Sequence, residues 1–240
     1  MKALIFAAGL GTRLKPLTDN KPKALVEIEG ETLLYYAIQK LKKHGYNQII
    51  INTHHFSNQI IDFTKSNDFG VRLEISDETD NLLNTGGGLQ KARWFFDDDE
   101  PFLVYNVDIL SNIDIDDMLK QHKESKALVT LAVMDRKTSR YFLFDDDNNL
   151  CGWRNKKENK EIIIHQKPTL HEFAFSGIQI INPKYFSLVN KEGSFPIVEV
   201  YLDLAKNYII KAYNHTDTVW CDFGKLPELE NAKQIIKSIY

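Results

Sequence analysis

Residues 2–25 read KALIFAAGLGTRLKPLTDNKPKAL, and this stretch decides the fold of the first half of the chain. Its apolar run over 2–8 is typical of a strand that is buried on both faces of a sheet. The run ends at Gly9, and a polar loop rather than a helix follows it. Residues 9–23 are therefore expected at the carboxyl end of the first strand, where open α/β sheets bind their ligands.

Downstream of this loop, apolar runs alternate with helical patterns. The apolar runs predict strands over 48–52 and 102–105, and an alternating pattern predicts another over 71–75. The helical patterns predict helices over 31–44, about 60–64 and 88–96. This alternation implies right-handed crossovers, and it predicts an α/β protein, a three-layer α/β/α sandwich with a mixed, mainly parallel sheet. Three further loops then follow strand ends, at 52–55, 84–88 and 106–108.

The second half of the chain is richer in strands joined by polar turns. Strands are predicted over 127–133, 141–144, 150–154, 161–165, 173–181, 208–214 and 217–221, and helices over 196–206 and 226–239. The acidic runs 97–99 and 145–147 are interpreted as solvated turns. Because the chain has no internal repeat and no low-complexity linker, we expect one domain over 1–240.

The composition argues against several classes of protein. Lys and Arg number 30 and Asp and Glu number 33, a net charge of −3, so no basic face for nucleic acid or a membrane surface is expected. Cys151 and Cys221 lie outside any CxxC pair, which favours a reducing compartment. No segment has the roughly 18 apolar residues of a membrane span. The N-terminal apolar run predicts a buried strand rather than a signal peptide. We expect a cytoplasmic protein.

The loop after the first strand concentrates cations around a glycine turn. Its basic residues are Arg13, Lys15, Lys21 and Lys23. Successive N–H groups of such a turn can cradle anionic oxygens, and cations beside it suit a triphosphate. Leu14 breaks a dinucleotide-binding GxGxxG pattern, and no Walker motif is present. The alternative interpretation is a solvated surface loop.

Two carboxylates that are remote in sequence follow predicted strands. Asp108 follows the strand 102–105, and Asp222 lies in the motif WCDFG. Magnesium prefers a few carboxylates together with phosphate oxygens and water, so this pair predicts an Mg²⁺ site. Alternatively, Asp108 caps a turn and Asp222 caps the last helix. Adjacent His54 and His55 cannot easily face one ion, and we interpret them as polar residues that end a strand.

The segment Asn84–Gly88, NTGGG, opens the predicted helix 88–96. Glycines at a helix N-terminus suit the close approach of a base or a phosphate. The alternative is a flexible turn in which Thr85 caps the helix.

The stretch 7–28, AAGLGTRLKPLTDNKPKALVEI, resembles the signature of the sugar-phosphate nucleotidyltransferases. The resemblance implies a Rossmann-like nucleotidyltransferase fold, with a nucleotide-binding half over about 1–110 and a sugar-binding half over about 111–240. It implies Arg13 and Lys23 as catalytic contacts to the phosphates, and Asp108 and Asp222 as metal ligands. The implied nucleotide-binding residues are Ala8, Gly9, Gly11, Thr12, Thr85, Gly86 and Gly87, with Glu78 or Asp80 as a reader of the base. The implied sugar-phosphate contacts are Asn106, Lys167, Ser176 and Gly177.

This chain departs from the family pattern at three positions. Val107 replaces a usual glycine, Lys225 a usual threonine, and Gln166 the glutamate of an EKP motif. These departures put the size and recognition of the sugar in question.

The resemblance implies that a nucleoside triphosphate, for which we expect UTP, reacts with a sugar 1-phosphate by direct in-line displacement to give a nucleotide sugar and pyrophosphate. Among family members the chain is most similar to the short uridylyltransferases for N-acetylmuramate 1-phosphate, and next to the mannose 1-phosphate guanylyltransferases. The enzyme is expected to be a monomer or homodimer. A non-catalytic sugar-nucleotide sensor and a glycosyltransferase are the alternatives, although Asn106-Val-Asp108 is no DxD motif.

Overall fold

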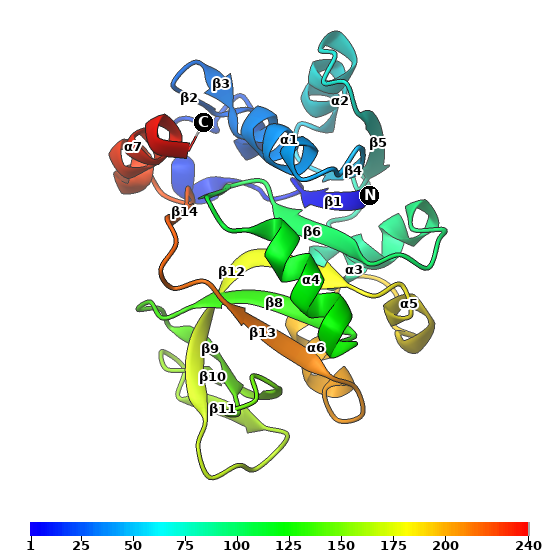
Figure 1. Cartoon of the computed structure of the whole chain (residues 1–240). Coiled ribbons are helices and arrows are strands. Elements are labelled where there is room, and N and C mark those ends of the chain that lie inside the picture. The colour runs from blue at the N-terminus through cyan, green and yellow to red at the C-terminus, as the bar shows by residue number, and fades with distance from the viewer. Residues whose placement is uncertain (240) are drawn as a thin grey trace.

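Four parallel strands form one side of the main sheet in the computed structural model, which describes residues 1–239. They are β1 (Lys2–Phe6), β4 (Gln48–Thr53), β5 (Arg72–Asp77) and β6 (Phe102–Asn106), in the order β6-β1-β4-β5 (Figure 1). The apolar residues of β1, β4 and β6 are buried on both faces, as their continuous apolar runs predict, whereas β5 is mostly half-buried or exposed. The mixed, mainly parallel central sheet with flanking helices is thereby confirmed.

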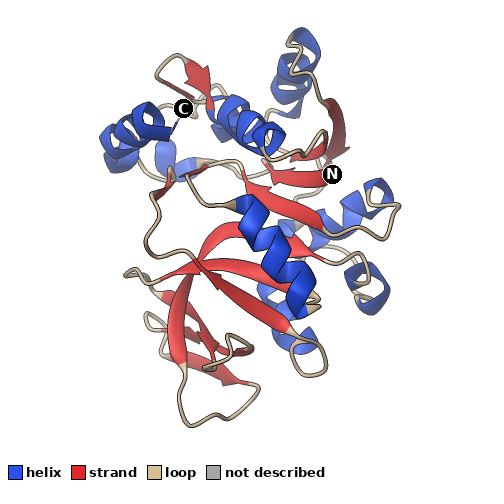
Figure 2. Ribbon diagram, in the orientation of Figure 1, coloured by secondary structure: helices blue, strands red, loops and turns tan. Residues whose placement is uncertain are grey.

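Helices cover both faces of the sheet (Figure 2). One core contains buried residues of α1 (Leu33–Lys43), α2 (Ser57–Ser66), α4 (Ile115–Ser125) and α7 (Leu229–Ile239). The opposite core contains those of α3 (Asn84–Lys91), α5 (Tyr185–Leu188) and α6 (Ile197–Leu204). Strand β1 divides between them, because Ala3 and Ile5 face the first core and Leu4 faces the second. No helix within residues 1–239 is long and apolar enough to cross a membrane.

The second half adds mostly antiparallel strands to the same sheet. The long strand β12 (His171–Ile181) joins the two halves, because it pairs with β6 on one side and with β8 (Val129–Met134) and β9 (Arg140–Phe144) on the other. Strands β10 (Leu150–Asn155) and β11 (Lys160–Ile163) extend β9, and β13 (Ile210–Asn214) pairs with β8. Two short pairs lie apart from this sheet: β7 (Ile109–Ser111) with β14 (Trp220–Asp222), and β2 (Glu27–Ile28) with β3 (Glu31–Thr32).

The structure corrects three local predictions. Helix α3 begins at Asn84 rather than at residue 88, so the three glycines lie inside its first turns. Helix α4 was not predicted, although Asp114 is a regular N-cap whose carboxylate accepts a hydrogen bond from the Asp117 amide at 2.9 Å. The loop 9–23 is not wholly irregular, because short 3₁₀ turns span Thr12–Leu14 and Lys23–Leu25. Further 3₁₀ turns span Ala92–Phe95 and Leu226–Glu228.

The prediction of a solvated turn over 145–147 is wrong for Asp145. This side chain is buried, and its carboxylate accepts hydrogen bonds from the amides of Asp147 and Asn149. The buried carboxylate thus holds the β9–β10 turn together through hydrogen bonds to its backbone. The sequence alone does not show which of three consecutive acidic residues has a buried side chain.

Candidate active site

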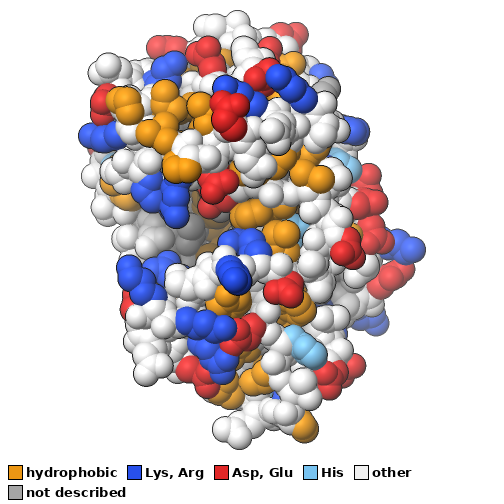
Figure 3. Space-filling model, turned by 90° about the vertical axis from the view of Figure 1, so that its left-hand side faces the viewer, with side chains coloured by type: hydrophobic (Ala, Val, Ile, Leu, Met, Phe, Trp, Pro, Cys, Tyr) orange, Lys and Arg blue, Asp and Glu red, His pale blue; other side chains and the backbone are white. Residues whose placement is uncertain are grey.

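A cavity of about 540 Å³ opens at the carboxyl ends of β1, β4 and β6. Each of the four segments predicted at strand ends contributes to its lining, through Gly9, Asn52, Thr85 and Asn106 among others. Figure 3 shows a hollow on this side of the molecule with Lys and Arg side chains around it. The volume lies within the range of small-molecule sites.

The glycine turn forms one wall of the cavity. Gly11 has a left-handed φ of 64°, and a Cβ there would lie 3.0 Å from Thr18 Cγ2 and 3.3 Å from Lys23 Cβ. Glycine therefore allows the turn to pack on the segment that carries Lys23. A Cβ on Gly9 would meet nothing within 4 Å, so the space beside Gly9 is free of protein atoms.

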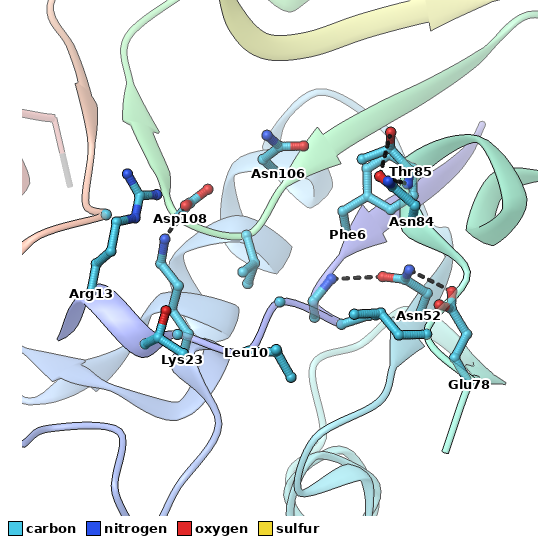
Figure 4. A pocket seen from close by; sticks show the side chains of 18 of the residues that line it. Phe6, Leu10, Arg13, Lys23, Asn52, Glu78, Asn84, Thr85, Asn106 and Asp108 are labelled. Atoms are coloured by element: carbon cyan, nitrogen blue, oxygen red, sulfur yellow. Dashed lines mark hydrogen bonds and ion pairs between the residues drawn. The ribbon is translucent and has the colours of Figure 1, made fainter. Parts of the chain in front are cut away.

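Arg13, Lys23 and Asp108 gather at one end of the cavity, which we call the phosphate end (Figure 4). The largely buried Lys23 ammonium forms an ion pair with the Asp108 carboxylate. The other two cations of the loop behave differently, because Lys15 pairs with Asp19 and Lys21 with Glu27 at the surface.

Asp222 lies next to Asp108 because the β7–β14 pairing sets it opposite Ile109. The Phe223 amide also donates to the Asp108 carbonyl at 2.9 Å. A Cβ on Gly224 would lie 2.8 Å from Asp222 Oδ1 and 3.1 Å from Arg13 Nη2, so these two side chains converge here. The alternative of Asp222 as a helix cap is wrong, since Lys225 occupies the N-cap of the following 3₁₀ turn.

The Asp222 carboxyl is in an unusual electrostatic environment. Burial, and then the nearby Asp108 charge, raise its pKa to about 6, although Lys23 and Arg13 oppose this effect. Its Oδ1 atom is buried and has no hydrogen-bond partner among the described residues. An orphaned carboxylate oxygen beside a second carboxylate fits a divalent cation. No three His, Cys, Asp or Glu residues within 1–239 are grouped for a metal, so such an ion needs further ligands from substrate or water.

The opposite end of the cavity, which we call the base end, is a closed hydrogen-bond network (Figure 4). Asn52 accepts from the Ala7 amide at 2.7 Å and donates to the buried Glu78 carboxylate at 2.8 Å. The other Glu78 oxygen accepts from the Leu83 amide at 3.1 Å. Of the two candidate base readers, Glu78 lines the cavity and Asp80 is exposed outside that lining. The sequence pattern indicated the loop 52–55 but not Asn52 itself. The feature that could have identified Asn52 is its polar side chain directly after the buried run Ile49–Ile51.

The glycines of NTGGG approach protein atoms. A Cβ on Gly86 would lie 2.4 Å from the Phe195 ring, and a Cβ on Gly87 would lie 2.1 Å from the Gly193 carbonyl oxygen. Asn84 and Thr85 line the cavity instead. Thr85 does not cap the helix, because Leu83 is the N-cap and the Thr85 hydroxyl accepts from the Ile197 amide at 3.0 Å.

The predicted sugar-phosphate contacts lie in different places. Asn106 lines the cavity, and a Cβ on the left-handed Gly177 would lie 2.9 Å from Asn106 Nδ2. Ser176 is buried behind it, with its hydroxyl 2.7 Å from His215 Nε2. Lys167 is not brought to this site, because its ammonium lies 3.2 Å from Asp145 in a second cavity of about 380 Å³.

The remaining residues singled out in the sequence have simple structural roles. Val107 lines the cavity but also belongs to the hydrophobic core on the α1 side of the sheet. His54 Nδ1 donates to the Glu78 carbonyl at 2.7 Å, which holds the strand end in place, and His55 is exposed.

The fold is that of nucleotidyltransferases. It superimposes with a TM-score of 0.81 on a putative glucose-1-phosphate thymidylyltransferase from Bacillus anthracis, at 21% identity over 100% of this chain and 96% of the other. The TM-score is 0.76 with HddC from Yersinia pseudotuberculosis complexed with GMP-PN, at 21% identity over 98% and 99% of the two chains. The family described as Nucleotidyl transferase matches residues 2–238, and the chain belongs to this family.

Curated relatives are sugar 1-phosphate nucleotidyltransferases. The N-acetylmuramate alpha-1-phosphate uridylyltransferase of Neisseria meningitidis serogroup B is 27% identical over 98% of each chain. The UTP–glucose-1-phosphate uridylyltransferase of Synechocystis is 27% identical over 95% of this chain and 61% of its own length. The mannose-1-phosphate guanylyltransferase catalytic subunit beta of Danio rerio is 35% identical over 83% of this chain and 59% of its own length. The chain thus spans about six-tenths of the latter two proteins.

Proposed function

We propose that this protein transfers a nucleoside monophosphate from a nucleoside triphosphate to a sugar 1-phosphate and releases pyrophosphate. The convergence of Arg13, Lys23, Asp108 and Asp222 at one end of a nucleotide-sized cavity carries this proposal. The triphosphate is UTP, in line with the uridylyltransferases from Neisseria and Synechocystis.

In this function, residues 1–110 bind the nucleotide and residues 111–240 bind the sugar. The triphosphate extends along the turn of Ala8, Gly9, Gly11 and Thr12, whose backbone N–H groups are suited to anionic oxygens. The base lies toward Asn84 and Thr85 at the start of α3, while Gly86 and Gly87 let this turn pack closely on Phe195 and Gly193. Glu78 acts by fixing this end through Asn52 and Leu83. The sugar lies beside Asn106, Ser176 and Gly177, whereas Lys167 lies in the second cavity and has no part in this proposal.

The chain needs no nucleophile of its own, because the attacking phosphate oxygen of the sugar 1-phosphate is already an anion. That oxygen forms a bond to the α-phosphorus while the bond to the pyrophosphate leaving group breaks in line. Arg13 and Lys23 orient the phosphates and offset their charge, which is the main demand of phosphoryl transfer. Lys23 exchanges its ion pair with Asp108 for the phosphates when the nucleotide binds.

Asp108 and Asp222 would hold a divalent cation, Mg²⁺, next to these phosphates. Such an ion would supply positive charge against the negative charge that develops at the α-phosphorus. The orphaned Asp222 Oδ1 atom and the raised pKa of that carboxyl fit this role, because both indicate a carboxylate that the fold leaves uncompensated.

We extend the proposal to a cytoplasmic enzyme of cell-wall precursor synthesis that works as a monomer or homodimer. The similarity to the Neisseria uridylyltransferase over the full length of both chains supports the precursor role. Cys151 and Cys221 are free and buried, which is compatible with a reducing compartment.

The test is a pyrophosphate-release assay with each of the four nucleoside triphosphates against a panel of sugar 1-phosphates. We expect release that depends on Mg²⁺ and is greatest for UTP with N-acetylmuramate 1-phosphate. Preference for GTP with mannose 1-phosphate would favour the guanylyltransferase alternative, which the 35% identity to the Danio rerio subunit supports. Nucleotide-sugar binding without pyrophosphate release under any pairing would overturn the proposal in favour of a non-catalytic sensor. Release of a nucleoside diphosphate from a nucleotide sugar would favour a glycosyltransferase.

A further inference from the structure

Arg136 is a cation that the fold positions without an acidic partner. It follows β8 directly, and its guanidinium lies over the Trp220 ring at 4.4 Å from the ring centroid. No carboxylate of the described residues forms a salt bridge with it. Arg136 is half-buried, and its buried Nε atom has no hydrogen-bond partner among the described residues. A desolvated guanidinium without a carboxylate is costly, which is typical of a group that awaits an anionic ligand.

The strand that carries Trp220 places Arg136 near Asp222, just outside the residues that line the cavity. Trp220 and Asp222 are two residues apart on β14, so their side chains project from the same face of the strand. A guanidinium stacked on Trp220 therefore lies on the Asp222 side of β14. The negative charge of Asp222 acts on the Arg136 guanidinium, and it partly opposes the lowering of the Arg136 pKa by burial.

The orientation of Arg136 is fixed by contacts to the sugar side of the site. One Nη2 hydrogen donates to the Phe175 carbonyl at 2.9 Å, and the Trp220 indole donates to the Ser176 carbonyl at 3.0 Å. The Ser176 hydroxyl is in turn held by His215. These contacts fall at the register shift in β12, next to the left-handed Gly177. A guanidinium has five N–H donors, so others remain beyond the one used for Phe175.

We propose that Arg136 binds the phosphate group of the sugar 1-phosphate substrate. This inference rests on the proposed function. It means that a cation from the second half of the chain binds the phosphate of the sugar 1-phosphate. A planar guanidinium suits a phosphate because it can donate two parallel hydrogen bonds. Arg13 and Lys23 are then free for the triphosphate. Lys167 is less suited to this role, since its ammonium is 3.2 Å from Asp145 in the second cavity.

The test compares Arg136→Gln and Arg136→Lys with the control Arg140→Gln, which removes an exposed arginine from the start of β9. In steady-state assays with Mg²⁺, Arg136→Gln should raise the KM for the sugar 1-phosphate by about 10- to 100-fold, the effect of one or two charged hydrogen bonds. The KM for the nucleoside triphosphate should stay within about twofold. Arg136→Lys keeps the charge but cannot donate two parallel hydrogen bonds, so it should raise the KM for the sugar 1-phosphate by a smaller factor. Titration calorimetry of the sugar 1-phosphate against each protein should give matching losses of affinity.

The outcomes separate this inference from the proposed function. If the wild-type protein releases no pyrophosphate with any sugar 1-phosphate, both are overturned. If it does, and Arg136→Gln leaves the KM for the sugar 1-phosphate unchanged or raises both KM values equally, Arg136 is not the phosphate anchor. Should Arg136→Gln fail to fold, Arg136→Lys decides the question. A folded Arg136→Lys protein should bind the sugar 1-phosphate more weakly than the wild type but bind the unphosphorylated sugar equally well. Wild-type affinity for both ligands would overturn the assignment.

Discussion

The two ends of the cavity are built on opposite principles. At the base end, Asn52 and Glu78 use their polar atoms to bind other parts of the protein, so the network is complete without a ligand. At the phosphate end, Asp222 has an orphaned oxygen and Lys23 is paired with Asp108, which is itself a candidate ligand. Satisfied groups give rigidity and uncompensated groups give affinity for a ligand. Under the proposed function, we therefore expect the base end to act as a scaffold and the phosphate end to be the reactive part.

The largest effect should follow from a change at the phosphate end. Lys23→Met removes a charge from the transferring phosphates but keeps the apolar part of the side chain. We expect kcat to fall by about 100- to 1000-fold, the usual loss for one preorganised electrostatic group. Steady-state pyrophosphate release measures this, with Lys21→Met as a matched control because Lys21 pairs with Glu27 at the surface. Near-normal turnover of Lys23→Met would remove Lys23 from the mechanism.

The same change offers a readout without catalysis. Lys23 neutralises Asp108 in the ligand-free protein, so Lys23→Met should bind Mn²⁺ more tightly than the wild type in the absence of nucleotide. Electron paramagnetic resonance of free Mn²⁺ measures the difference, expected at several-fold. Equal Mn²⁺ affinities would show that Lys23 and the cation do not compete for Asp108.

Asp222→Asn should separate stability from function. Burial and Asp108 raise the pKa of Asp222 from 3.8 to about 6, so the charged form destabilises the fold. This cost is full above about pH 6 and disappears below about pH 4, where the group is protonated in both the folded and the unfolded state. At pH 8 in EDTA, Asp222→Asn should therefore increase the free energy of unfolding by about 1–3 kcal/mol. Turnover should fall at least about 100-fold, through the lost metal ligand.

Urea unfolding at pH 8 and at pH 4 measures this prediction. The gain in stability should be present at the higher pH and absent at the lower one, and the exposed Asp217→Asn should show neither effect. A destabilised Asp222→Asn protein at pH 8 would mean that the carboxylate is satisfied in the fold.

A change at the base end should affect stability and binding more than chemistry. The glutamine of Glu78→Gln has one acceptor oxygen and one NH₂ group in place of two acceptor oxygens. Either the Asn52 side-chain amide or the Leu83 backbone amide, both of them donors, would therefore face another donor. We expect a loss of about 1–3 kcal/mol in the free energy of unfolding. The KM for the nucleotide should rise several-fold while kcat stays within about twofold. The exposed Asp80→Asn is the control, and a large fall in kcat for Glu78→Gln alone would erase the distinction between the two ends.

The sequence predicted the phosphate end better than the base end, for a physical reason. Arg13, Lys23, Asp108 and Asp222 are charged residues beside glycines and strand ends, and their chemistry is visible in a linear pattern. The role of Asn52 depends on contacts with Ala7 and Glu78, which lie 45 and 26 residues away, and no local pattern records these contacts.

The alternating apolar runs predicted the parallel core, because burial on both faces leaves a continuous hydrophobic signature. Predictions failed where one side chain turned inward from a polar stretch, as Asp145 does. They also failed where glycine served packing, as at Gly86 and Gly87. Arg136 gave no signal, because its partner Trp220 is distant in sequence and supplied by a different strand.

The smallest effect distinguishes two glycines that the sequence treated alike. A Cβ on Gly87 would lie 2.1 Å from the Gly193 carbonyl oxygen, so Gly87→Ala should lower the free energy of unfolding by about 1–3 kcal/mol through overpacking. A Cβ on Gly9 would meet nothing within 4 Å, so Gly9→Ala should change that free energy by less than about 0.5 kcal/mol. Because the open space beside Gly9 belongs to the cavity, Gly9→Ala should still weaken nucleotide binding several-fold in a calorimetric titration. If Gly9→Ala binds nucleotide as the wild type does, the phosphates do not approach this part of the turn. The phosphate end would then be confined to the four charged side chains Arg13, Lys23, Asp108 and Asp222.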